Sequence, residues 1–132
     1  VIGNGLFWSV NRLELNNLSS LQILYIGNGC FGKVRVFELN GLGDLESVVI
    51  GKECFTYAKT YDDIWNSKRT DGSCRIVNCP KLKSIQFGGY SFSDYHSFEL
   101  NSLSSLQSIE MGERCFFYSI SFSLTGLIDG SV

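Results

Sequence analysis

Apolar and polar residues alternate along two short runs that recur throughout the chain. The first run, seen at residues 106–112, has the form L-x-x-I-x-M-G, and the second, seen at 98–103, has the form F-x-L-x-x-L. Alternation with a period of two residues is typical of a half-buried β-strand. No segment sustains the spacing of an amphipathic helix. The pattern therefore predicts two short strands in each recurring unit.

The recurring units are copies of one internal repeat. Units open at Leu21, Leu45, Leu82 and Leu106, at spacings of 24, 37 and 24 residues, and residues 1–20 match 25–44 without a gap. We call each unit a rung. The five rungs span residues 1–20, 21–44, 45–81, 82–105 and 106–132, and the third carries a 13-residue insertion. The whole chain is thus predicted to be a single repeat array.

Stacked rungs place equivalent residues in columns, because each rung repeats the pattern of the one before it. A rung of about 24 residues leaves little room for a helix, so we predict an all-β solenoid of parallel strands about 4.8 Å apart. The apolar columns must stack to make one core. A column of glycines follows the first strand and is expected to supply the positive φ of a tight corner. The main columns are Phe7, Phe31, Phe55, Phe92 and Phe116; Leu13, Phe37, Cys74, Phe98 and Phe122; Leu15, Leu39, Ile76, Leu100 and Leu124; Leu18, Leu42, Cys79, Leu103 and Leu127; and Gly3, Gly27, Gly51, Gly88 and Gly112.

The loop that contains the insertion, residues 56–73, is the candidate partner-binding loop. It combines aromatic and charged residues, which is the composition of binding surfaces. Insertions in repeat arrays map to loops on one face, often the recognition face. The alternative is a loop that folds back and covers apolar surface, since Ile64 and Trp65 must bury somewhere. The candidate binding residues are Tyr57, Lys59, Tyr61, Trp65, Lys68 and Arg69.

Composition excludes several classes of function. A net charge of −2 and the absence of a basic stripe argue against nucleic-acid binding. No run of about 18 apolar residues is present, so no membrane insertion is expected. The chain lacks an initiator Met and a signal-peptide pattern, which suggests a processed product or an excerpt from a longer protein.

The five cysteines do not suggest a metal site. Cys30, Cys54 and Cys115 share a column with Leu6 and Ser91, which predicts a small inward-facing slot. Neighbouring Cys30 and Cys54 are close enough for a disulfide on distance alone, but parallel side chains seldom reach the required torsion. We therefore expect buried free thiols. No Cys-x-x-Cys pair exists, so neither a metal nor another cofactor is expected.

Candidate catalytic residues are equally sparse. Asp94 and His96 lie close together in one bend, but no nucleophile accompanies them, and His96 is expected on a surface loop. Lys33 and Arg35 are expected to form a solvated basic spot. On the outer face, Arg75 is expected to pair with Glu38 or Glu99, at a gain of about 1 kcal/mol or less for each pair. We expect no enzymatic activity.

The segment L-x-x-[LIV]-x-[IFM]-x-x-x-x-F resembles the leucine-rich repeat signature. The Ile-Gly step, the Cys-Phe pair and the second Phe-x-Leu run look most like the BspA-like subgroup of bacterial and protist surface proteins. This resemblance covers the chain outside the insertion and implies a repeat solenoid at a cell surface. The family often places Asn in the turn after the first strand, whereas that column here is Gly5, Gly29, Glu53, Tyr90 and Arg114.

Neither end of the chain has the polar cap that repeat arrays normally carry. In repeat register Val132 corresponds to Ser108 and Val1 to Glu110, so a second copy would continue the solenoid with one position missing. The leading hypothesis is a structural module that stacks head to tail on copies of itself or on neighbouring repeats, as an extracellular filament subunit. The alternative is a recognition or adhesion module that binds a protein or glycan through the loop. Asn17 fits the N-glycosylation pattern, which would place the protein outside the cytosol. The expected end-to-end contacts are Val1, Ile2, Leu124, Leu127 and Ile128.

Overall fold

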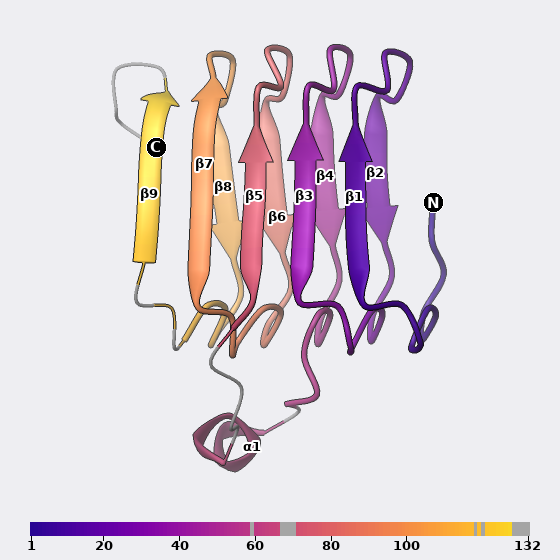
Figure 1. Cartoon of the computed structure of the whole chain (residues 1–132), viewed down its shortest axis with the longest axis vertical. Helices are drawn as coiled ribbons and strands as arrows, with labels where there is room; N and C mark the ends of the chain where they lie inside the picture. The colour runs from indigo at the N-terminus through magenta and orange to yellow at the C-terminus, as the bar shows by residue number, and fades with distance from the viewer. Residues whose placement is uncertain (59, 67–70, 118, 120, 128–132) are drawn as a thin grey trace.

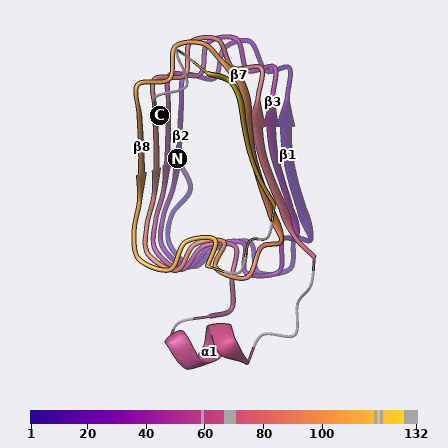
Figure 2. The ribbon, with the colours of Figure 1, turned by 90° about the vertical axis from the view of Figure 1, so that its left-hand side faces the viewer.

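The chain folds into a parallel β-solenoid whose turns carry two facing sheets. The computed structural model describes all residues except 59, 67–70, 118, 120 and 128–132. One sheet has the order β1-β3-β5-β7-β9 and the other β2-β4-β6-β8 (Figure 1), and they form opposite sides of the coil seen in Figure 2. The strands are β1 Arg12–Asn16, β2 Ile23–Ile26, β3 Val36–Asn40, β4 Ser47–Ile50, β5 Ser73–Val77, β6 Ser84–Phe87, β7 Ser97–Leu103, β8 Ser108–Met111 and β9 Ser121–Leu127.

The strand register confirms the predicted columns. Leu13 in β1 lies opposite Phe37 in β3, which lies opposite Cys74 in β5 across the insertion. Phe98 in β7 likewise lies opposite Phe122 in β9. The prediction of an all-β solenoid with parallel strands and rungs of about 24 residues is therefore confirmed.

A stack of phenylalanine rings runs through the core between the two sheets. Successive centroids along the column Phe7, Phe31, Phe55, Phe92 and Phe116 are 5.1, 5.2, 4.5 and 5.0 Å apart, and the ring planes lie within 10° of each other. All five residues have φ between 51° and 62°, in the left-handed region that bulky residues rarely adopt. The backbone strain is offset by ring burial and stacking.

The glycine column does not have the predicted role. Its members lack positive φ, and their small size serves instead for close contact between rungs. A Cβ on Gly51 would lie 2.9 Å from the carbonyl carbon of Gly27, and one on Gly88 would lie 2.5 Å from that of Gly51. Real Cβ atoms do not approach backbone this closely. Positive φ instead occurs two residues later, at positions such as Gly5 and Gly29.

Asparagine side chains at the first corner, one position before the column of Gly5 and Gly29, link neighbouring rungs. Asn4 Oδ1 accepts a hydrogen bond from the Asn28 amide at 2.7 Å, and Asn28 Oδ1 accepts one from the Lys52 amide at 2.8 Å. These bonds satisfy backbone donors between neighbouring rungs. A Cβ on Gly27 would lie 2.4 Å from Asn4 Oδ1, so the glycine column also makes room for this ladder.

The insertion leaves the third rung after Ala58 and carries one short helix, α1 Tyr61–Trp65, below the solenoid (Figures 1 and 2). Thr60 caps the helix: its hydroxyl accepts from the Asp63 amide, and the Asp63 carboxylate accepts from the Thr60 amide, each at 3.2 Å. This helical turn was not predicted, because a five-residue helix is too short to show a periodic pattern.

Candidate functional site

A partly buried polar cluster holds the returning end of the insertion against the solenoid. Arg35 Nε lies 3.0 Å from Asp71 Oδ1, Arg35 Nη1 lies 3.3 Å from Asp94 Oδ1, and Nη2 donates to the Asp71 carbonyl at 2.6 Å. The Arg35 guanidinium also lies 4.8 Å from the ring centroid of Tyr95. The Arg35 side chain is only 17% exposed, so the prediction of a solvated residue at this position is wrong.

Tyr95 fills the space that opens where the chain departs into the insertion. Its side chain is fully buried, and its hydroxyl donates to the carbonyl of Val34, two rungs away. Gly72 brings the chain back with φ +108°, and a Cβ there would lie 2.8 Å from Arg35 Nη2 and 3.1 Å from the Tyr95 ring. The neighbouring His96 is exposed, as predicted.

An exposed aromatic pair marks the first edge of the candidate loop. The rings of Trp8 and Tyr57 are parallel within 6°, with centroids 6.0 Å apart, and their side chains are 37% and 46% exposed. Trp8 reaches Tyr57 by lying across Gly32, where a Cβ would stand 2.0 Å from the indole. The third rung's loop is thereby in contact with the first rung.

The other placed aromatic residue of the loop contacts the last rung. Trp65 is 56% exposed, and its ring meets the edge of Phe117 at a centroid distance of 6.3 Å. The guanidinium of Arg114 lies 5.3 Å from the same Phe117 ring. Ile64, beside Trp65 in α1, is fully buried, so the loop both covers apolar surface and exposes aromatic rings.

Four of the six predicted binding residues of the loop have no described side chain. Lys59, Lys68 and Arg69 lie outside the described residues, and Tyr61 is described only as the first residue of α1. Tyr57 and Trp65 are placed, but each belongs to a different aromatic cluster.

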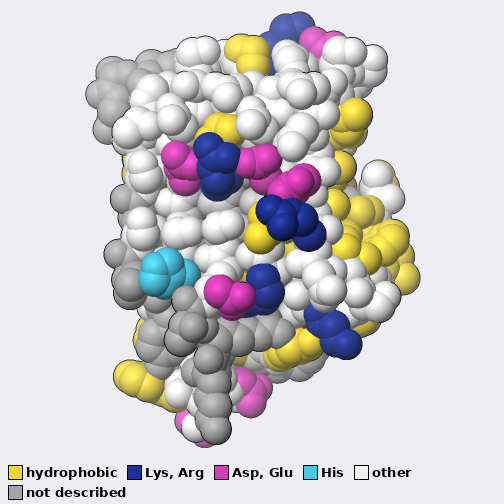
Figure 3. Space-filling view, viewed as in Figure 1, with side chains coloured by type: hydrophobic (Ala, Val, Ile, Leu, Met, Phe, Trp, Pro, Cys, Tyr) yellow, Lys and Arg dark blue, Asp and Glu magenta, His cyan; other side chains and the backbone are white. Residues whose placement is uncertain are grey.

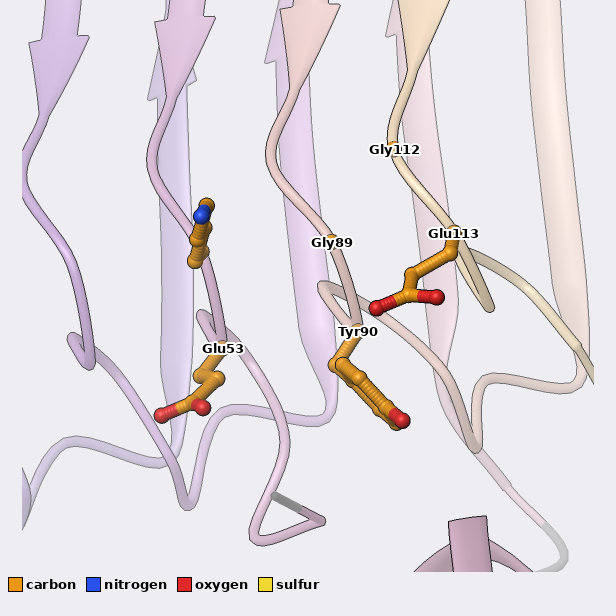
Figure 4. A pocket seen from close by; sticks show the side chains of 6 residues that line it. Glu53, Gly89, Tyr90, Gly112 and Glu113 are labelled. Atoms are coloured by element: carbon orange, nitrogen blue, oxygen red, sulfur yellow. The ribbon is translucent and has the colours of Figure 1, made fainter. Parts of the chain in front are cut away.

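An open groove of about 410 Å³ lies along the first corner (Figure 4). Glu53, Tyr90 and Glu113 project from successive rungs beside it, and Glu53 and Tyr90 have positive φ of 58° and 66°. The sequence reasoning missed this groove, whose only signal was the replacement of glycine in one turn column. Its walls carry both signs of charge, and no group of three His, Cys, Asp or Glu in the described residues suits a metal ion.

The cysteine column forms a ladder of hydrogen bonds between rungs. All five thiols are free, and three of them donate to glycine carbonyls of the preceding rung. The donors and acceptors are Cys30 with Gly3 at 2.9 Å, Cys54 with Gly27 at 3.0 Å and Cys115 with Gly88 at 3.1 Å, while the Ser91 hydroxyl donates to Gly51 at 2.7 Å. Burial raises the pKa of Cys54 and of Cys115 to about 11, which keeps these thiols protonated and unreactive at neutral pH.

The outer face of the five-stranded sheet carries paired charges. Arg75 forms ion pairs with both Glu38 and Glu99, which confirms the expected pairing. Arg12 pairs with Glu14 within the edge strand β1. Figure 3 shows these charges in the middle of the face, with apolar side chains gathered toward the β1 edge on the right. The paired charges leave the apolar edge as the more distinctive surface.

The first rung exposes side chains whose equivalents are buried elsewhere. Phe7 is 49% exposed, whereas Phe31 in the next rung is 2% exposed. Of the predicted end contacts, Val1 is fully exposed and Ile2 is partly buried through its bridge to Ile26.

At the opposite end of the solenoid, Leu124 lies exposed in β9. Leu127 lies opposite Leu103, and its side chain is not described, while Ile128 lies outside the described residues. Asn17 is exposed at the corner after β1.

Comparisons with protein-family models, with curated protein sequences and with solved structures found no significant match. No helix of the described residues is long and apolar enough to cross a membrane. The two parallel sheets of stacked rungs define the class of the protein as a parallel β-solenoid.

Proposed function

We propose that the chain is a non-catalytic structural module that extends by head-to-tail stacking on a second copy of itself. The exposed face of the first rung carries this proposal. Phe7 presents one ring face to Phe31 and leaves the other side open, although every phenylalanine of this column in the next four rungs is buried. A stacked rung would remove that apolar surface from water, which is the main driving force of association.

Strand pairing supports the same proposal. Among the described residues, β1 pairs only with β3 and β9 only with β7, so each presents an edge to solvent. Unpaired strand edges are templates for further pairing unless they are blocked. Contact between two different faces of identical copies produces an open filament when the rotation between successive copies does not close a ring.

The test is the state of assembly of the isolated 132-residue chain. Light scattering across a concentration series should show growing particles, and negative-stain electron microscopy should show filaments. Five rungs at about 4.8 Å predict an axial repeat of roughly 24 Å. A monodisperse monomer at the highest concentration would overturn the proposal.

The exposed Trp8–Tyr57 pair favours recognition of a protein or glycan as a second candidate function. Two stacked aromatic rings that are partly exposed offer apolar surface of the kind that is enriched in binding sites. A glycan array and a surface-protein panel would test this function, with the Tyr57→Ser variant beside the parent chain. Binding that is unchanged by this substitution would remove the pair from the site.

We further propose a leucine-rich repeat of the BspA-like subgroup, working outside the cell. The recurring L-x-x-[LIV]-x-[IFM] segment supports the proposed family. The exposed Asn17, which fits the N-glycosylation pattern, supports the location outside the cell. Mass spectrometry of the native material is the test: an attached glycan on Asn17 is expected, and cytosolic recovery of unmodified protein would contradict the location.

A further inference from the structure

Two series of backbone hydrogen bonds at the first corner run to the preceding rung at successive interfaces, while a third series, such as Gly29 to Lys52 at 2.9 Å, runs to the following rung. The amide that follows the first strand donates to the preceding rung at 2.8 Å four times in succession, from Gly27 to Ile2, Gly51 to Ile26, Gly88 to Ile50 and Gly112 to Phe87. The phenylalanine amides behave alike: Phe31 donates to Leu6, Phe55 to Cys30 and Phe92 to Cys54, at 3.1, 2.9 and 3.0 Å. Each rung therefore presents two donors to the rung before it.

In the first rung the equivalent donors are the amides of Gly3 and Phe7. At the other end of the solenoid, the carbonyls equivalent to the acceptors belong to Met111 and Cys115. No rung precedes Gly3 in the described chain, and none follows Cys115 at this corner. The two ends are thus complementary at these two donor positions and two acceptor positions.

The glycine column adds a steric condition to this match. A Cβ on Gly27 would lie 2.9 Å from both the Gly3 carbonyl carbon and the Asn4 amide nitrogen of the preceding rung. At Gly3 the nearest atom to such a Cβ is Leu6 Cδ1, at 3.7 Å, within its own rung. The direction that leads to the preceding rung is open at Gly3 in the single chain.

We propose that the head-to-tail contact uses this one register, with the amides of Gly3 and Phe7 donating to the carbonyls of Met111 and Cys115 of a second copy. Gly3 then lies against the backbone that follows Met111 of that copy. The inference rests on the proposed function and specifies its interface. In this register, assembly requires a glycine at position 3, whereas folding of the single chain does not require one.

The decisive variant is Gly3→Ala. We expect an unchanged Tm at low concentration, where the chain is monomeric, and association weakened about tenfold or more. Gly43→Ala is the matched control, because a Cβ at Gly43 meets nothing within 4 Å. That control should fold and assemble like the parent chain.

A mixing experiment tests the polarity of the contact. Leu124→Glu places a charge on the exposed side of β9 and should block the opposite end. At a concentration where the parent chain assembles, each variant alone should be mainly monomeric, and an equimolar mixture should form dimers that grow no further, because each copy retains one working end.

The outcomes separate the interface from the function. Filaments of Gly3→Ala that match those of the parent chain would overturn this register and leave head-to-tail stacking standing. A parent chain that stays monomeric would overturn the proposed function and this interface together. Dimers of Gly3→Ala by itself would show a symmetric contact and would also refute the register.

Discussion

Glycine at the first corner acts through its size, and Gly51 illustrates the effect. A Cβ there would lie 2.3 Å from Asn28 Oδ1 and 2.9 Å from the Gly27 carbonyl carbon. Gly51→Ala should therefore lower the free energy of unfolding by about 1–3 kcal/mol, as overpacking does elsewhere. Chemical denaturation measures the change, and Gly43→Ala should stay within about 0.5 kcal/mol of the parent chain. Equal stabilities for the two variants would refute the close contact between rungs.

The cysteine ladder makes stability sensitive to alkaline pH. The Cys54 thiol has an ordinary pKa of 9.0, and burial raises this pKa to about 11 in the folded chain. Between these values the unfolded chain loses its proton first, so the stability that the protonated thiol contributes is complete below pH 9 and is lost as pH rises through 11.

The matched variant for this prediction is Cys54→Ser, because Ser91 already occupies the same column and bonds the Gly51 carbonyl. The variant should lose less stability than the parent chain between about pH 9 and 11, with a difference of order 2 kcal/mol. Urea titrations at several pH values measure both slopes. Parallel pH profiles would show that this thiol is not shifted.

At the scale of elements, the insertion is joined to the solenoid by Arg35. Arg35→Met removes the guanidinium that lies 3.3 Å from the nearly buried Asp94 carboxylate, which should cost about 3 kcal/mol. Arg12→Met is the control, since Arg12 is 64% exposed and its pair with Glu14 contributes less than about 1 kcal/mol. Thermal denaturation compares the two. An unchanged Tm for Arg35→Met would mean that Tyr95 alone fills the gap at the insertion.

The insertion should also be removable without loss of the fold. Deleting residues 59–71 joins Ala58 to Gly72, as Val34 is joined to Arg35 in the second rung, and restores 24-residue spacing. We expect the strand signal in circular dichroism to persist with a modestly lower Tm, because the deletion removes the buried side chain of Ile64. Loss of cooperative melting in the deletion variant would instead show that the solenoid depends on α1 to fold.

Sequence periodicity predicted the elements of the solenoid but not those of the insertion. The columns of Leu13 and Leu15 could be read directly, because every rung repeats the same packing problem. Arg35 and Tyr95 escaped prediction because they fill a gap that exists at one rung only, so no repeat pattern reports it. The groove beside Tyr90 was missed because its lining residues differ from rung to rung, so no repeat pattern marks them.

At the scale of the whole molecule, the described strands pair only with those of neighbouring rungs, so local stability should vary along the axis. Amides of β5, which has strands on both sides, should exchange with deuterium more slowly than those of β1. Mass spectrometry of peptides from the two strands measures this difference. Protection of β1 should rise when copies stack, and protection that is uniform at every concentration would contradict the model of open ends.

The insertion leaves the solenoid after Ala58 and returns at Gly72, and Arg35 and Tyr95 close the gap between these two points. A segment that leaves and re-enters at one sealed point can change in length and sequence while the strand spacing stays fixed. If copies stack, each filament would present this segment in a regular row at intervals of roughly 24 Å. An epitope or enzyme grafted at this point would then repeat along the fibre at a spacing that the backbone alone determines.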